Sequence, residues 1–153
     1  MTSYTAELLW ERGAADFPGK HYSRQHLVSF DGGARTVWSA SPQHVPAPWS
    51  DAAAIDPEEA FVAALSSCHM LWFLALAATK GYCVDRYADS PVGLMERNAS
   101  ARLAMTVVTL RPDVKFSGEL QPAAKEIAGL HERAHEECYL ANSVRTEVRV
   151  EPK

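Results

Sequence analysis

Three cysteines and a group of histidines are the residues of this sequence with the most reactive side chains. Cys68 lies in the apolar stretch "AALSSCHMLWFLALAATKG", with His69 beside it. A free cysteine in such a stretch is commonly a small buried hydrophobic residue, but it can also be a nucleophile or a metal ligand. The run "SSCH" interrupts the apolar pattern, and its polar side chains need partners. We therefore expect this stretch to meet a pocket at Cys68.

A second cysteine, Cys138, ends a row of potential metal ligands in "HERAHEECYLANS". On a helix, His131, His135 and Cys138 would share one face, because residues three or four positions apart are neighbours. Two imidazoles and a thiolate can bind zinc, with Cys68 as a fourth ligand. Histidines at this spacing are also common in helices that bind nothing, so we predict no metal and no other cofactor. The third cysteine, Cys83, is expected to pack at the start of a strand.

The composition is that of a folded protein of ordinary polarity. The chain has 153 residues, enough for a core, and we predict a single domain over residues 1–153. A net charge of −4 offers no basic surface for nucleic acid or for an anionic membrane. No basic segment followed by an apolar run opens the chain, so we expect a cytoplasmic protein, in which thiols stay reduced. The cysteines form neither a C-x-x-C pair nor a zinc-finger pattern.

The apolar stretch belongs to the helix with the strongest signals in the sequence. Asp56 suits the N-cap position, Pro57 suits the first helical position, and Glu59 has the spacing of a capping box. Gly81 marks the end of the helix. We predict a helix from Pro57 to about Lys80. Its middle is apolar on most faces, which predicts burial on several sides.

The remaining segments predict the fold class. Strands are expected in residues 4–12, 22–30 and 35–41, with the hairpin signal "DGGA" between the last two, and a proline-rich loop follows over residues 41–55. Residues 82–96 and 101–118 have strand patterns, residues 121–141 form an amphipathic helix, and residues 143–152 form a last strand. The order β-β-β, helix, strands, helix, β indicates an α+β fold with antiparallel sheets packed on two main helices.

Two segments of the sequence, taken together, resemble a known family. "DPEEAFVAALSSCHM" followed by "RAHEECYLANSVRTEVRV" resembles the OsmC/Ohr family, the osmotically inducible and organic hydroperoxide resistance proteins. The resemblance covers nearly the whole chain in length, element order and position of both motifs. It implies an OsmC-like fold, an intertwined homodimer, and a thiol peroxidase that reduces organic hydroperoxides without haem, metal or flavin in oxidative-stress defence.

The resemblance also implies roles for individual residues. Cys68 matches the peroxidatic cysteine, Cys138 the resolving cysteine and Glu58 the family glutamate, while Arg24 is our choice for the family arginine and Arg12 the second choice. A free thiol is only slightly ionised at neutral pH, and a guanidinium beside it favours the reactive thiolate. A carboxylate paired with that guanidinium would orient it. The family implies a dithiol or a lipoylated protein as the reductant.

The motifs of this chain depart from the family pattern at several positions. Tyr139 stands in place of a proline and Ala141 in place of a serine, while Asn142 is kept. In the first motif, Asp56 replaces an asparagine and His69 replaces an apolar residue. With these departures the chain resembles an OsmC-like branch of the family. The alternative function is that of a non-catalytic OsmC-like protein that binds a small hydrophobic or thiol-bearing ligand.

Helical spacing adds an expectation about assembly. Glu58 and Cys68 are ten positions apart, which separates them by roughly 15 Å along a straight helix. They cannot share a site within one chain unless the helix bends. We therefore expect a two-fold homodimer, in which Glu58 and Arg24 of one chain approach the thiol of the other.

Overall fold

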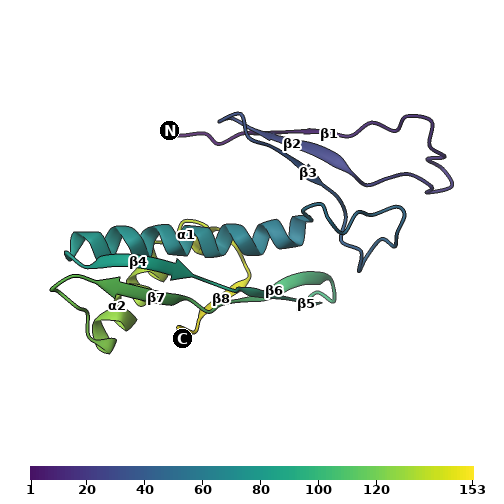
Figure 1. Cartoon of the computed structure of the whole chain (residues 1–153). Coiled ribbons are helices and arrows are strands. Elements are labelled where there is room, and N and C mark those ends of the chain that lie inside the picture. The colour runs from purple at the N-terminus through teal and green to yellow at the C-terminus, as the bar shows by residue number, and fades with distance from the viewer. The chain divides into compact units, whose positions relative to one another are not determined.

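The computed structural model describes residues 1–153, which separate into two compact units. The N-terminal unit is Met1–Ala60 and the C-terminal unit is Phe61–Lys153, so the boundary falls within the first turn of the long helix α1. The prediction of one domain over the whole chain stays a prediction beside this division. Figure 1 shows the order of the elements along the chain.

A three-stranded antiparallel sheet forms the regular part of the N-terminal unit. Strands β1 (Ala6–Leu9), β2 (His26–Phe30) and β3 (Arg35–Trp38) are neighbours in that order, as the sequence predicts. The β2–β3 turn needs Gly33, whose φ of +87° favours glycine. The proline-rich segment that follows contains no helix or strand, which agrees with the expected loop.

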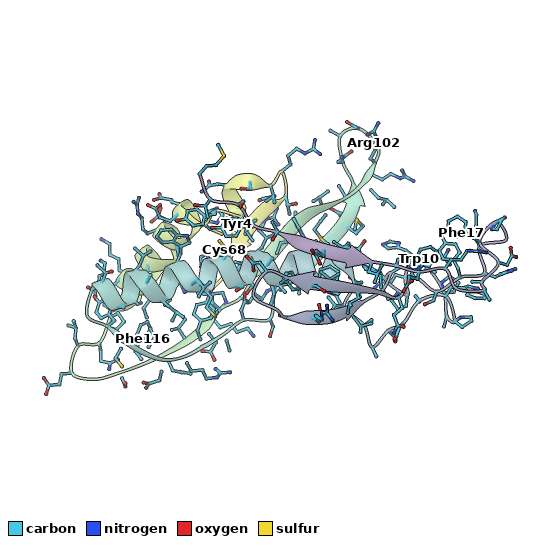
Figure 2. All side chains as sticks on the ribbon, turned by 90° about the horizontal axis from the view of Figure 1, so that it is seen from above. Tyr4, Trp10, Phe17, Cys68, Arg102 and Phe116 are labelled. Carbon is cyan, nitrogen blue, oxygen red and sulfur yellow. The ribbon has the colours of Figure 1, made fainter.

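Aromatic side chains gather in the connection between β1 and β2. The rings of Trp10, Phe17 and Tyr22 lie with their centroids 4.7 to 5.7 Å apart. Figure 2 labels Trp10 and Phe17 on this connection. The guanidinium of Arg24 lies over the Tyr22 ring, 3.8 Å from its centroid. These rings contact one another although Trp10 and Phe17 are 37% and 47% exposed.

Helix α1 (Pro57–Thr79) begins and ends with the signals expected for it. The Glu59 amide donates to Asp56 Oδ1 at 2.8 Å, and the Asp56 amide donates to Glu59 Oε2 at 3.3 Å, which together form a capping box. At the other end Gly81 has a φ of +79°, and the Gly81 and Tyr82 amides donate to carbonyls of the last turn. The predicted helix was one residue too long.

The C-terminal unit contains two sheets. Strands β4 (Cys83–Ala88) and β7 (Asp113–Ser117) form one, while β5 (Val92–Arg97), β6 (Leu103–Leu110) and β8 (Glu147–Val150) form the other. Each of the two long segments predicted as a strand is therefore divided into two, at residues 89–91 and 111–112. The chain changes sheet at both points. Strand β8 pairs in parallel with β6, so the second sheet is mixed rather than purely antiparallel.

Helix α2 (Ala124–Glu137) is shorter at both ends than the predicted helix over residues 121–141. Pro122 precedes its first turn, and the Ala123 amide donates to the Glu126 carboxylate at 2.7 Å. At its other end Cys138 takes extended backbone angles, with φ −64° and ψ 109°. A short 3-10 helix, η1 (Ala141–Ser143), then leads toward β8. The α+β fold class with two main helices is confirmed.

Two apolar clusters hold the C-terminal unit together, and α1 contributes to both. The cluster around Phe73 and Leu130 joins α1, α2 and the β4–β7 sheet, while Leu65 packs against Val108 and Leu110 of β6. The buried residues of α1 recur every four positions and therefore lie on one face: Leu65, His69, Phe73 and Ala77.

By length and composition alone, α1 is apolar enough to cross a membrane, with a mean hydropathy of 1.8. Central helices of globular proteins also meet these criteria, and one face of α1 packs in the core described above. Only 22% of its apolar window is buried within the chain itself. The helix therefore leaves much apolar surface that the single chain does not cover.

Candidate active site

The two cysteines singled out in the sequence meet between α1 and α2. Cys68 lies about halfway along α1, where Figure 2 labels it, and Cys138 caps the C-terminus of α2. The Cys68 thiol lies close enough to Cys138 to raise the pKa of the Cys138 thiol. Seventy residues separate them in the sequence, so this contact depends on the packing of the two helices. The structure thus brings together the predicted nucleophile and the predicted resolving thiol.

The two thiols differ in exposure and in protonation. Cys138 is 1% exposed, whereas Cys68 is half-buried. Burial raises the pKa of Cys138 to about 11, and the neighbouring Cys68 thiol acts in the same direction. The Ala141 amide, 3.4 Å from the Cys138 sulfur, opposes the rise by favouring the thiolate. At neutral pH Cys138 therefore holds its proton, and Cys68 is the thiol that a solute reaches first.

The N-terminal unit contains the charged residues assigned to the site, which are Glu58 and Arg24, with Arg12 as the second choice. The Arg24 guanidinium donates to the Tyr22 carbonyl at 2.6 Å and to the Lys20 carbonyl at 3.1 Å. Arg12, the second choice, donates to the Ala15 carbonyl at 3.2 Å. Both arginines thus make backbone contacts in the β1–β2 connection. Their placement beside a thiol stays a prediction.

Glu58 lies half-buried in the first turn of α1. An acidic side chain there is favoured by the partial positive charge at a helix N-terminus. Because α1 runs without a break from Pro57 to Thr79, Glu58 and Cys68 are separated by roughly 15 Å along its axis. That Glu58 serves the thiol of a second subunit stays a prediction.

A buried pair of histidines is the main feature that the sequence did not reveal. His69 Nε2 and His131 Nδ1 are 3.1 Å apart, and the two rings are nearly parallel, at 5° to one another. The two residues are 1% and 3% exposed. Burial lowers the pKa of each ring to about 4, so both are neutral at pH 7. A polar residue, His69, in an apolar helix indicated that a buried partner was needed. The sequence did not identify that partner on α2.

This pairing bears on the zinc alternative considered above. His131 directs one ring nitrogen at His69, and Cys138 has Cys68 as its neighbour. No group of three or more histidine, cysteine, aspartate or glutamate side chains is arranged to hold a metal ion. Of the four residues considered as zinc ligands, His131 therefore faces His69, Cys138 neighbours Cys68, and His135 Nδ1 has no hydrogen-bond partner.

The serine of "SSCH" next to the buried face also has a specific partner. Ser66 Oγ donates to Asp89 Oδ2 at 2.6 Å, and Asp89 Oδ1 accepts from the Arg111 amide at 2.6 Å. Asp89 thus links α1 to the two points at which the chain passes from one sheet to the other. The expectation that the polar interruption needs partners is confirmed for Ser66, Cys68 and His69.

Comparison with known proteins agrees with this architecture. A family model described as OsmC-like protein matches residues 50–153. An OsmC-like protein of unknown function from Vibrio cholerae is 47% identical over 100% of both chains, with a TM-score of 0.98. No curated protein matches the chain.

More distant solved structures share the fold. An organic hydroperoxide resistance protein, OsmC, from Legionella pneumophila is 16% identical, covers 99% of this chain and 96% of its own, and has a TM-score of 0.69. The organic hydroperoxide resistance protein OhrB of Bacillus subtilis is 18% identical, with coverage of 99% and 98% and a TM-score of 0.68. Together, the family match and the 47% identical relative show that this chain belongs to the OsmC-like protein family.

Proposed function

We propose that the protein is a cysteine-based peroxidase that reduces organic hydroperoxides. The observation that carries this proposal is the contact between a half-buried Cys68 and a buried, protonated Cys138. The family to which the chain belongs includes organic hydroperoxide resistance proteins, and this supports a role in peroxide resistance. The difference in burial supports Cys68 as the attacking thiol and Cys138 as the resolving one.

The chemistry proceeds in three steps. The Cys68 thiolate attacks the terminal oxygen of the hydroperoxide, the O–O bond breaks, and the leaving alkoxide takes a proton to become an alcohol. Cys68 is then a sulfenic acid, which Cys138 attacks to form a disulfide with release of water. An external dithiol, such as a reduced lipoyl group, reduces this disulfide by thiol–disulfide exchange. The exchange restores both thiols and leaves the external dithiol oxidised to its own disulfide.

Backbone donors around Cys138 suit the second step. Its sulfur must lose a proton before it can attack, although burial holds that proton in place. The Ala141 amide at 3.4 Å stabilises the thiolate that forms. The Asn142 side chain donates to the Glu136 carbonyl at 2.8 Å and so holds the turn that carries this amide. Asn142, kept from the family motif, thus acts as a positioning residue.

A homodimer completes the proposed site. Only four of the 23 residues of α1 are buried, although the helix is apolar on most faces. A second copy of the chain would cover this surface, which otherwise exposes residues such as Leu71. In that assembly Glu58 and Arg24 of one subunit approach Cys68 of the other, where the guanidinium favours the thiolate.

Peroxide consumption in cysteine variants tests the function. With cumene hydroperoxide and dihydrolipoamide, we expect Cys68→Ser to abolish turnover. Cys138→Ser should consume about one equivalent of peroxide per subunit and then stop. Cys83→Ser is the matched control, because this exposed thiol takes no part in the pair, and it should turn over like the wild type. Unchanged turnover in Cys68→Ser would refute the assignment.

Mixed dimers test the shared site. If Glu58 serves Cys68 of the partner subunit, Glu58→Gln and Cys68→Ser homodimers are both impaired. A mixed dimer of these two variants then holds one intact site and should recover about half of the wild-type activity. Absence of recovery in mixed dimers, or a stable folded monomer in sedimentation equilibrium, would contradict the shared site.

The alternative function is that of a protein that binds a small hydrophobic or thiol-bearing ligand without turnover. An open pocket on the C-terminal unit supports this alternative. The same peroxide assay separates the two, since a binding protein would consume no peroxide beyond the oxidation of its own thiols.

A further inference from the structure

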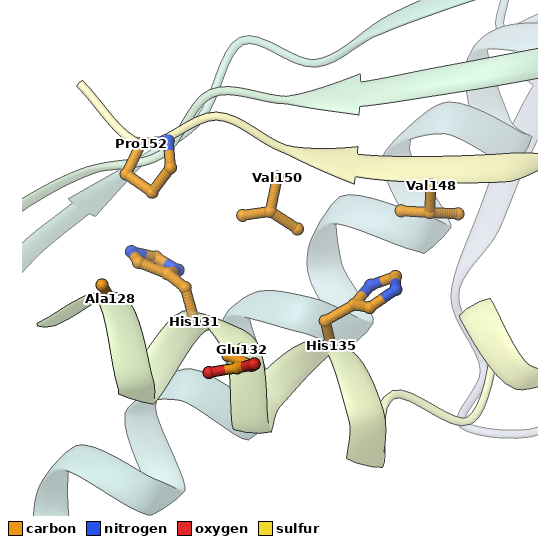
Figure 3. A pocket seen from close by; sticks show the side chains of 7 residues that line it. All are labelled: Ala128, His131, Glu132, His135, Val148, Val150 and Pro152. Atoms are coloured by element: carbon orange, nitrogen blue, oxygen red, sulfur yellow. The ribbon is translucent and has the colours of Figure 1, made fainter.

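A pocket lies between α2 and the C-terminal segment of the chain (Figure 3). Its volume is about 330 Å³ and it is open to solvent. Helix α2 contributes His131, Glu132 and His135 to its wall, and Val148, Val150 and Pro152 form the facing side. Neither Cys68 nor Cys138 lines it. The pocket therefore shares His131 with the histidine pair but includes neither thiol.

Two histidine nitrogens at this pocket lack hydrogen-bond partners. His131 is 3% exposed, and its Nδ1 is engaged with His69, which leaves its Nε2 buried and unpaired. Nδ1 of His135 is also buried and unpaired. Nearly all buried polar atoms in folded proteins have a partner, and each exception calls for an explanation. A bound molecule in the pocket would supply these partners.

We propose that this pocket binds a small uncharged organic molecule that carries a hydroxyl group on an apolar body. The His69–His131 hydrogen bond can form with either ring as the donor, so His131 Nε2 is a donor in one tautomer and an acceptor in the other. A hydroxyl group both donates and accepts, and it therefore fits either tautomer. Val148, Val150 and Pro152 would contact the apolar body.

Charge and size narrow the class of ligand. His131 is neutral at pH 7, because burial lowers its pKa to about 4, and Glu132 adds a carboxylate to the wall. An anionic ligand would find no cation among these residues. The volume is at the lower end of ligand pockets, roughly 300–1,000 Å³. A single ring or a short chain with one hydroxyl group is thus the appropriate size.

A metal ion fits the pocket less well than an organic ligand. His131 and His135 with Glu132 between them have the spacing of zinc-binding helices. In Figure 3, however, the two rings point to different ends of the pocket, one toward Pro152 and the other toward Val148. No group of three suitable side chains is arranged around a common point.

Nuclear magnetic resonance of the histidine imidazoles tests the proposal directly, with benzyl alcohol as the probe and toluene as its partner without a hydroxyl. We expect benzyl alcohol to shift the His131 and His135 nitrogen signals saturably, with a dissociation constant at least tenfold below that for toluene. Equal affinities for the two probes, or shifts that do not saturate, would overturn the proposal. The measurement requires no peroxidase activity, so it succeeds or fails independently of the proposed function.

Two tryptophan variants locate the binding. Ala128 is exposed and lines the pocket, so Ala128→Trp should fill it and remove the saturable shifts. Arg133→Trp is the matched control on the opposite side of α2 and should bind benzyl alcohol within about twofold of the wild type. Binding that survives in Ala128→Trp would place the probe elsewhere and refute the site. His135→Phe keeps a ring but loses the nitrogens, and it should reduce the preference for benzyl alcohol over toluene.

Discussion

The buried His69–His131 pair makes the stability of the protein depend on pH in a defined window. Each ring has a pKa of about 4 in the folded chain, against an ordinary value of 6.5. Between these values the unfolded chain binds protons that the folded chain excludes. The contribution of these two histidines to the free energy of unfolding is therefore complete above about pH 6.5. It falls as the pH is lowered and is lost below about pH 4.

The size of the effect follows from the two shifts. A shift of one pKa unit corresponds to about 1.4 kcal/mol, so each histidine contributes about 3 to 4 kcal/mol and the pair up to about 7 kcal/mol. The steepest dependence, with two protons taken up on unfolding, is about 2.7 kcal/mol per pH unit near pH 5. This is a large part of the stability of an ordinary domain, about 5–15 kcal/mol. We expect the protein to approach unfolding between about pH 4 and 5.

Urea unfolding at pH 7.0, 6.0, 5.5 and 5.0 measures this dependence, with protein concentration fixed. The double variant His69→Gln/His131→Gln retains hydrogen-bonding side chains that do not titrate, so its free energy of unfolding should vary little over this range. His44→Gln, at an exposed position, is the matched control and should follow the wild type. Paired carboxylates such as Asp113, with a lowered pKa, lose their contribution at lower pH and affect all variants alike. Parallel curves for the wild type and the double variant would refute the reasoning.

Two further predictions concern α1 and its packing. Asp56→Ala removes the acceptor for the Glu59 amide, so thermal unfolding should show a loss of about 1 kcal/mol with little change in peroxide turnover; a loss near zero would mean that the cap does not stabilise α1. At Gly93, an added Cβ would lie 2.5 Å from the Met105 sulfur and 2.7 Å from Val62 Cγ2. Gly93→Val should therefore destabilise the protein by about 1–3 kcal/mol in urea unfolding, and an unchanged midpoint would show that these side chains move aside freely.

Local signals in the sequence predicted those parts of the fold that depend on neighbouring residues. The capping box at Asp56, the terminating Gly81 and the turn at Gly33 act within a few positions, so α1 was predicted to within one residue and the β2–β3 turn was placed correctly. The outer ends of β2 and β3 were predicted four and three residues too long. The division of the long strands was missed, because the chain changes sheet at Asp89 and at Arg111, where a side chain and an amide meet across 22 positions. Such a contact leaves no periodic pattern.

The candidate site shows the same limit. Motif order identified Cys68 and Cys138 as a pair, and the helices bring them into contact. Residue spacing on α2, taken alone, grouped His131 with Cys138 as possible ligands of one metal, since it says nothing of what faces each side chain. The structure gives His131 a histidine of the other helix as its neighbour. Nothing in the local sequence distinguishes these two arrangements.

The thiol pair and the histidine pair lie at the same interface between α1 and α2, and the first responds to oxidation while the second responds to pH. Cys68 and His69 are adjacent on α1, and their partners, Cys138 and His131, lie seven positions apart on α2, roughly 10 Å along that helix. Contacts at these two points hold α1 against the last two turns of α2, one through sulfur and the other through buried neutral rings. Closing a disulfide requires the two sulfurs to approach to about 2.05 Å, so oxidation must shift the packing in which the rings lie.

If the proposed chemistry occurs, the imidazole signals of His69 and His131 should therefore change when Cys68 and Cys138 are oxidised, and the signal of the exposed His44 should stay constant. Unchanged ring signals in the oxidised protein would show that the two pairs move independently.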